Sequence, residues 1–435
     1  MQRSEGRVRG AIAGGLAAYL ALAVAWSFVI PLGGGIDEPR HFRYVQIVAQ
    51  ERRLPTPAEK AEAISHHPPL HYVVAAPLYL ATAHLGEETA WRSLRGLSIL
   101  MGAGAVLLTI ATLRRMLPAT PWAAVAGGIF VALLPHFQLT TVLLSNDASV
   151  TLLCSLMLYL TVRAIMEPRR AVMFSILAGL AAGLATMTKM NGLIPVPAAL
   201  LAVGVAGLLR APELELDRVS RVLRNMVGFI AAFALTGGLW IARHLDVWGT
   251  LESDPPWPAH TWPVHTFAER LFRAIEGLYR STWAQMGWLP GPHSAPPLGP
   301  SELWPRPNLE TPILALTLPL AAIAIAGTVA LCIRWLRSED SRRPGLATAL
   351  LIGAFVLAYA AVAHSAIYLH PGRHEAARYA LQVVGATMGL FAIGPLILPR
   401  RWQVVCWVAT AALLIVMNAV SFWEMHVYMI PTFAP

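Results

Sequence analysis

Residues 36–44, Ile36-Asp37-Glu38-Pro39-Arg40-His41-Phe42-Arg43-Tyr44, follow directly on the first apolar segment of the chain. A second polar stretch, with the sequence HHPPLHY, occupies residues 66–72. Hydrophobic segments flank both stretches. Ionisable groups at a membrane boundary are energetically costly, and proteins keep them mainly where they have a function. This loop is therefore the first candidate for a functional site, and the alternative is a solvated loop whose charges only anchor it at the lipid headgroups.

The composition predicts an all-α polytopic membrane protein. Of the 435 residues, 56% are hydrophobic and only 13% are charged, which excludes an ordinary soluble domain of this length. The three cysteines (Cys154, Cys332 and Cys406) lie in apolar segments, so no disulfide framework or cysteine metal cluster is expected. The formal charge is +9, and its many arginines gather at segment ends. That distribution indicates membrane topology and contact with anionic lipid rather than nucleic-acid binding.

Eleven segments are predicted to cross the membrane, the first of them as a retained signal anchor. They are residues 11–32, 97–113, 121–140, 147–163, 171–188, 192–209, 226–242, 312–333, 346–367, 379–398 and 402–420. A twelfth apolar stretch, residues 68–85, would reverse the membrane side of every later loop if it also crossed. If it lies in the interface, every arginine-rich loop falls on the inner side, with the N-terminus inside and the C-terminus outside. We favour that topology, while the sequence alone leaves a crossing by residues 68–85 open.

This topology predicts three regions. Residues 1–242 form a transmembrane module with a first outer loop at 33–96, residues 243–311 form a long outer loop, and residues 312–435 form the C-terminal transmembrane helices. The polar groups that could carry chemistry then share one outer side. They are Asp37, Glu38, His41, His67, Arg92, Arg95, Asn146, Asp147, Lys189, Arg243, His244, His370, Arg373, His374 and Arg378.

Two of these groups are the most specific candidates. A carboxylate near apolar surface has its charged form disfavoured, so the pKa of Asp37 or Glu38 is expected to rise toward the range of a general base; pairing with Arg40 or Arg43 is the alternative. Lys189, one of only two lysines, lies at the outer end of an apolar segment. A compact ammonium there suits a phosphate group, and a lysine that only snorkels to the interface is the alternative.

The other candidates carry similar alternatives. Asn146 and Asp147 could cap a helix or belong to the site, and Arg92 and Arg95 could meet a lipid phosphate or only a headgroup. The cluster at 370–379 favours contact with an anion. Tryptophans of the long loop, such as Trp283, are expected in an interfacial belt or stacked on a sugar. No metal-ligand spacing is present, although the histidines and carboxylates leave a divalent metal open.

In their order along the chain these motifs resemble the GT-C superfamily of membrane glycosyltransferases, which includes protein O-mannosyltransferases and the lipid A aminoarabinose transferases. The matching elements are the Asp37–His41 motif, the His67–Tyr72 stretch, Arg92 or Arg95, the Ser145–Asp147 break and the Gly183–Lys189 helix end. Within the superfamily the chain looks most like a poorly characterised bacterial family with an Asp-Glu-Pro-x-His first loop. The segments Trp283–Trp288 and Arg373–Tyr379 correspond to two later motifs of that family.

The resemblance implies a GT-C module of about 11 transmembrane helices with interfacial helices in the first outer loop. It implies an inverting glycosyltransferase of the bacterial inner membrane, with its site facing outside or the periplasm. The donor would be a polyprenyl-phosphate-linked sugar, and the acceptor a glycan, lipid or protein. Asp37 or Glu38 would be the base, and Lys189, Arg92, Arg95, Arg373 and Arg378 would hold the donor phosphate. A membrane transporter or lipid flippase, or a non-catalytic relative that binds polyprenyl lipid, remains the alternative.

Overall fold

The computed structural model describes residues 2–35, 37–209, 215–250, 266–283, 310–369 and 376–424, and every regular element in these ranges is a helix. The long helices are α1 (Gln2–Val29), α5 (Glu87–Met116), α8 (Asp147–Met166), α9 (Ala171–Thr186), α11 (Glu215–Phe233), α14 (Glu310–Arg337), α15 (Arg342–His364) and α17 (Arg400–Glu424). Shorter helices complete the bundle: α2 (Glu38–Gln46), α4 (Leu70–Thr82), α6 (Pro121–Leu133), α7 (Pro135–Val142), α10 (Val196–Ala206), α12 (Leu239–Trp248), α13 (Phe267–Trp283) and α16 (Val384–Ile393).

Helices lie at the positions of the eleven predicted crossings, and in the described part of the chain nine or ten of them have the length and apolarity of a membrane span. Within the described residues, nine helices are long and apolar enough to cross a membrane. The pair α6 and α7, which bends by 59° at Leu134-Pro135, passes the same test when both helices are taken together, and is a broken span or a re-entrant loop. Proline has no amide hydrogen to donate and forces the preceding residue out of helical geometry. The predicted crossing at 192–209 corresponds to a shorter apolar helix, Met190–Ala206. The chain is a multi-pass membrane protein, as the sequence predicts.

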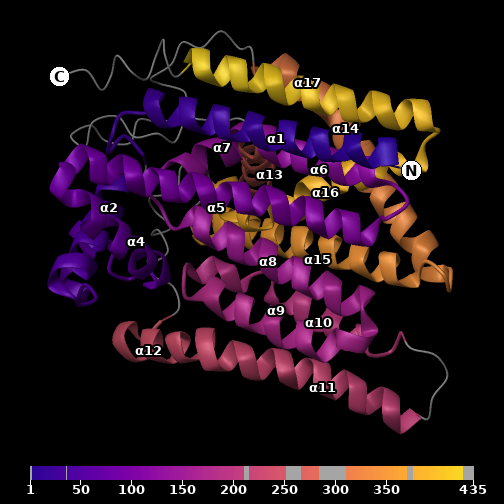
Figure 1. The fold of residues 1–435 in the computed structure, drawn as a ribbon, viewed down its shortest axis with the longest axis horizontal. Coiled ribbons are helices and arrows are strands. Elements are labelled where there is room, and N and C mark those ends of the chain that lie inside the picture. The colour runs from indigo at the N-terminus through magenta and orange to yellow at the C-terminus, as the bar shows by residue number, and fades with distance from the viewer. Residues whose placement is uncertain are drawn as a thin grey trace.

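The two ends of the bundle differ. The long helices run side by side, and the N-terminus and the α14–α15 and α16–α17 connections lie at one end, on the right of Figure 1. Helices α2, α4 and α12 lie at the other end, which we call the cap end. The arginine-bearing termini of α5 and α14 therefore have a common direction, and they also place positive charge at helix C-termini, where it complements the helix dipole.

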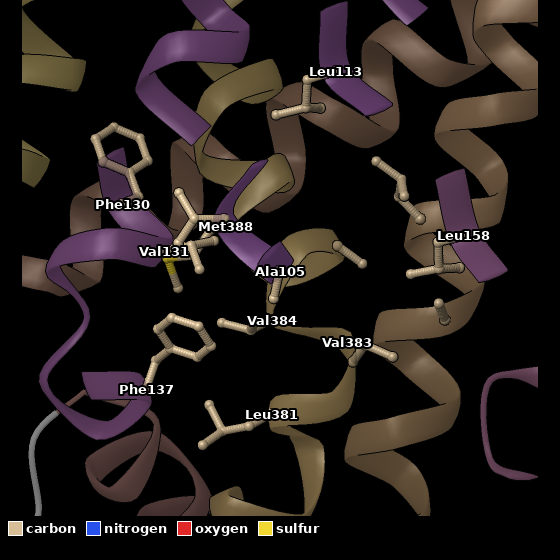
Figure 2. Close-up of a cluster of buried hydrophobic side chains, with 14 of the residues drawn as sticks. Ala105, Leu113, Phe130, Val131, Phe137, Leu158, Leu381, Val383, Val384 and Met388 are labelled. Carbon is tan, nitrogen blue, oxygen red and sulfur yellow. The ribbon is translucent and has the colours of Figure 1, made fainter. Parts of the chain in front are cut away.

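The core lies where α5, α6, α7, α8 and α16 meet. Figure 2 shows Phe130 and Val131 of α6 beside Met388 of α16, with Ala105 of α5 close by. Glycines allow the close approach of the helices: a Cβ on Gly179 of α9 would collide with the backbone of Phe229 in α11. Because lipid is as apolar as these side chains, such close packing rather than the hydrophobic effect holds membrane helices together.

The cap is a separate aromatic cluster. Phe42 of α2 stacks on Trp91 of α5 with ring centroids 4.2 Å apart, and Tyr44 stacks on Tyr72 of α4 at 3.7 Å. The 13 residues of α4 extend about 20 Å, which is less than the roughly 30 Å of a bilayer core. The amide of Leu70 donates to the carbonyl of Met187, 3.0 Å away, and joins α4 to the end of α9. This placement agrees with an interfacial helix in the first outer loop.

Two regional predictions differ from the structure. The predicted end of the first module at residue 242 falls inside α12, because the helix continues through a π-helical turn at Ala234–Gly238 to Trp248. The predicted outer loop also contains a helix, α13, which packs against α15. Its Trp283 is 3% exposed and lies edge-on against Phe391. Trp283 is therefore a core residue, and its predicted place in an interfacial belt is wrong.

Candidate functional site at the cap end

Glu38 and Arg95 form a completely buried ion pair between α2 and α5. Their side chains are 0% and 1% exposed. The guanidinium donates to both carboxylate oxygens of Glu38, at 2.8 and 2.7 Å. Its three other hydrogens go to the carbonyl oxygens of Ser27, Ile30 and Pro31, each 2.8 Å away. All five donors of the arginine are therefore used.

The remaining lone pairs of Glu38 are also occupied. Its two oxygens accept the backbone amides of Gly35 at 3.2 Å and Leu144 at 3.0 Å. The pair thus joins the end of α1, the start of α2, α5 and the segment after α7. Neither group has an atom left for a substrate, so this geometry does not support Glu38 as a base or Arg95 as a phosphate ligand. We assign both a structural role.

Asp37, unlike Glu38, has a partly exposed side chain that a substrate could reach. Its backbone is left-handed (φ 55°) at the start of α2, a conformation that Asp tolerates better than most residues. Its side chain is 35% exposed and accepts a hydrogen bond of 2.8 Å from Arg40. Burial alone would raise the pKa of Asp37, but His41, Arg40 and Arg378 outweigh it, and the pKa lies below its usual value. The predicted upward shift is wrong because the sequence does not show that these groups, two of them arginines, lie around the carboxylate.

Tyr72 connects the two histidines of the cap. Its hydroxyl lies 2.8 Å from Nδ1 of His41 and 3.3 Å from Nδ1 of His67. Asn146 continues the chain of contacts, with its amide nitrogen 3.2 Å from His67 and 3.0 Å from the carbonyl of Thr188. Burial lowers the pKa of His41 to about 3, so its ring is neutral at physiological pH. Sequence analysis did not select Tyr72, although it stands in the HPPLHY motif.

Lys189 and Arg378 converge on Asp147. Lys189 is paired with Oδ1 of Asp147 at the N-terminus of α8, and Nε of Arg378 lies 4.0 Å from Oδ2. All three side chains are at most 10% exposed. Both cations also lie over the ring of Tyr379, with Nζ of Lys189 5.1 Å and the Arg378 guanidinium carbon 5.0 Å from its centroid. The group contains two positive charges and one negative charge.

Asp37 and the group of Lys189, Arg378 and Asp147 belong to one site. Arg378 is among the groups that lower the pKa of Asp37, and Asp147 and Lys189 both act on the pKa of His41. Such interactions between charged groups act over distances of about 10 Å, so these groups lie in one neighbourhood. The fold therefore brings together residues from α2, α4, α8, the end of α9 and the segment before α16. Among them are the predicted candidates Asp37, His41, His67, Asn146, Asp147, Lys189 and Arg378.

The other predicted site residues lie apart from this cluster or outside the described residues. Arg92 pairs with Glu88 on the exposed side of α5. Arg243 is exposed and lies over the ring of Trp240, 5.1 Å from its centroid. His244 is buried on α12 beside Trp248. The predicted residues His370, Arg373 and His374 lie outside the residues that the structure describes.

The structure also bears on the predicted alternative of a divalent metal. Among the described residues, no group of three or more His, Cys, Asp or Glu side chains is placed to hold a metal ion. The two aspartates of the site, Asp37 and Asp147, are paired with Arg40 and Lys189 rather than facing another potential metal ligand. None of the steps proposed below passes through a metal ion.

Comparison with known proteins identifies the fold. Residues 66–235 match the model of the family described as dolichyl-phosphate-mannose-protein mannosyltransferase, and no curated protein matches the chain. The oligosaccharyltransferase AglB from Archaeoglobus fulgidus, solved with an inhibitory peptide and a dolichol-phosphate, has a TM-score of 0.53 at 13% identity, with 95% of this chain and 56% of that one covered. ArnT from Cupriavidus metallidurans, bound to undecaprenyl phosphate, has a TM-score of 0.50 at 14% identity, with 97% and 74% covered.

The chain has the GT-C fold. The predicted resemblance to GT-C membrane glycosyltransferases is thereby confirmed at the level of fold. The match spans just over half the length of the archaeal oligosaccharyltransferase. Identities of this size establish architecture and leave the activity to be argued from the site itself.

Proposed function

We propose that this protein transfers a sugar, with inversion, from a polyprenyl-phosphate-linked donor to an acceptor hydroxyl at the cap end of the bundle. One observation carries the proposal: a partly exposed carboxylate, Asp37, belongs to the same cluster as two buried cations, since Arg378 acts on the pKa of Asp37 and Lys189 on that of the neighbouring His41. A base and an anion site at one membrane boundary are what this transfer requires. The solved relatives with dolichol-phosphate and undecaprenyl phosphate support the choice of donor class, as does the matching family.

Asp37 would act on the acceptor. A hydroxyl is a weak nucleophile and needs a base within hydrogen-bond reach. The lowered pKa keeps Asp37 ionised at neutral pH, so it can accept the acceptor proton as the acceptor oxygen attacks the anomeric carbon. Attack from the side opposite the lipid phosphate inverts the configuration. Arg40 holds the carboxylate at 2.8 Å and fixes its direction.

Lys189 and Arg378 would act on the leaving group. As the bond between the sugar and the phosphate oxygen breaks, negative charge develops on the lipid phosphate. Cations fixed in place before the reaction stabilise that charge without reorganisation. Lys189 is paired with Asp147, and Arg378 lies 4.0 Å from the same carboxylate, so both cations are held in place before a phosphate arrives. Of the phosphate ligands predicted from the sequence, these are the two that the described geometry supports.

The first test is binding of undecaprenyl monophosphate to the purified protein. Wild type should bind saturably, and Lys189→Ala should weaken binding severely. The other lysine, Lys60, lies in the first loop over the ring of Trp248 and provides a matched control, since Lys60→Ala should bind as wild type does. Equal binding by all three proteins would remove the donor half of the proposal and favour the transporter.

The second test separates catalysis from binding. Asp37→Asn should retain binding of undecaprenyl monophosphate and lose release of this lipid from polyprenyl-phosphate sugars extracted from bacterial membranes. Asp246→Asn, an exposed carboxylate on α12, controls for the loss of one negative charge near the cap. If Asp37→Asn turns over as fast as wild type, Asp37 is not the base.

A further inference from the structure

A groove opens at the end of the bundle opposite the cap, between α1 and α17. Its volume is about 690 Å³, within the roughly 300–1,000 Å³ of ligand pockets. Helix α6 packs against both α1 and α17 and forms the floor (Figure 1). Toward the cap end, Trp26 of α1 stacks on Phe422 of α17 at 3.9 Å, and there the two helices contact each other.

The sequence explains why the groove is hollow. On α17 its wall is the stripe Arg400, Val404, Trp407, Val408 and Ala411, which is one helix face because these residues recur at steps of three, four and seven. Each of the three helices contributes an alanine to the lining: Ala11 of α1, Ala126 of α6 and Ala411 of α17. Alanine at these places leaves room that larger side chains would fill.

The groove has the polarity of a lipid molecule. Its depth is lined by apolar side chains, while Arg400 lines it at the first turn of α17 and is exposed. Among the lining residues of the described chain none is acidic. No carboxylate of the described residues pairs with Arg400. A single uncompensated cation at the entrance of an apolar groove complements a negative headgroup with apolar chains below it.

The length of the groove matches one leaflet. From Arg400 to Ala411 the helix rises about 16 Å, and half of a bilayer core is about 15 Å. We propose that the groove binds one anionic phospholipid from the leaflet at this end, with its phosphate at Arg400 and its acyl chains between α1, α6 and α17. This site is separate from the sugar-transfer site, which lies at the cap end of the same bundle.

Native mass spectrometry of the full chain, purified in detergent, tests the proposal with dioleoyl-phosphatidylglycerol and dioleoyl-phosphatidylcholine. Wild type should retain one phosphatidylglycerol in preference to phosphatidylcholine. Arg400→Gln should weaken retention about fivefold, as expected for the loss of one arginine near an anionic lipid. Arg401→Gln removes the same charge from the next residue, which does not line the groove. This variant should retain phosphatidylglycerol as wild type does.

A second pair of variants tests the acyl-chain part of the site. Val408→Trp should fill the groove and abolish retention, whereas Val405→Trp, on the same helix and outside the lining, should leave it unchanged. Both valines are more than half exposed, so neither substitution disturbs the core. The proposal is overturned if all variants retain phosphatidylglycerol equally, if phosphatidylcholine is retained as well as phosphatidylglycerol, or if undecaprenyl phosphate displaces phosphatidylglycerol from the groove.

Discussion

The buried pair of Glu38 and Arg95 predicts different effects when either of the neighbouring carboxylates, Glu38 or Asp37, is changed to its amide. Loss of the Glu38 charge should destabilise the protein, whereas loss of the Asp37 charge should mainly abolish turnover. Glu38→Gln keeps the shape of the side chain and removes its charge. Arg95 would then retain four of its five acceptors at best, and one of its N–H groups would face the new amide NH2 instead of an oxygen. The guanidinium has no route to water, since its side chain is 1% exposed. A buried charge would be left without its counter-charge.

The size of the effect follows from this burial. Breaking a buried ion pair by removing one partner costs about 3–5 kcal/mol, and two backbone amides lose a charged acceptor as well. The Asp37–Arg40 pair is about one-third exposed, and pairs in contact with water contribute about 0–1 kcal/mol. Glu38→Gln should therefore lower the free energy of unfolding by about 3–5 kcal/mol, and Asp37→Asn by no more than about 1 kcal/mol.

Unfolding of the purified protein in mixed detergent, followed by circular dichroism, measures both values. The double variant Glu38→Gln/Arg95→Met should be less destabilised than the sum of the single variants, with a coupling of about 0.5–3 kcal/mol. In a turnover assay Asp37→Asn should be folded and inactive. The reasoning fails if Glu38→Gln unfolds within 1 kcal/mol of wild type, or if Asp37→Asn is the less stable of the two.

Three further predictions follow from the same structure. Arg40 lowers the pKa of Asp37, so Arg40→Ala should raise that pKa and move the acid limb of the pH profile of kcat/KM to higher pH. The sign follows because Asp37 must be ionised to accept a proton, and an unmoved acid limb would contradict this assignment. Tyr72→Phe removes the hydroxyl shared by two histidines and should lower kcat/KM about fivefold, the equivalent of one hydrogen bond of about 1 kcal/mol, with an unchanged melting temperature; full activity would show that the contact has no role. Gly179→Ala should destabilise the bundle by about 1–3 kcal/mol because α9 and α11 must separate. Gly96→Ala, where a Cβ meets nothing within 4 Å, should be neutral or slightly stabilising in the same melting experiment.

Much of the fold could be predicted because membrane crossing imposes a strong constraint on sequence. Long apolar runs bounded by arginine identify the helices, and each of the eleven predicted crossings corresponds to a helical segment. The end of the seventh crossing was harder to predict. The chain passes its predicted end at residue 242 without a helix-breaking residue and stays helical to Trp248. Helix α13 was missed although the apolar residues of Phe267–Trp283 recur at helical spacing, a pattern that favours an amphipathic helix.

The composition of the site could be predicted better than its geometry. The motifs placed Asp37, His41, His67, Asp147 and Lys189 on one side, and the structure brings them into one cluster. The sequence could not separate Asp37 from Glu38, because the difference lies in Arg95, 57 positions away. Adjacent residues at a helix start point in different directions, and only the packing of α5 against α1 determines which of them is buried.

The pairing of Asp147 with two cations explains how two positive side chains can be held together in a buried site. Two buried cations beside each other would repel and pay a large desolvation cost if neither had a counter-charge. One carboxylate, held at the N-terminus of α8 where the helix dipole favours negative charge, satisfies Lys189 directly and Arg378 at 4.0 Å. Asp147 thereby keeps both cations at one place in the site, where a leaving phosphate would need them, before any ligand binds.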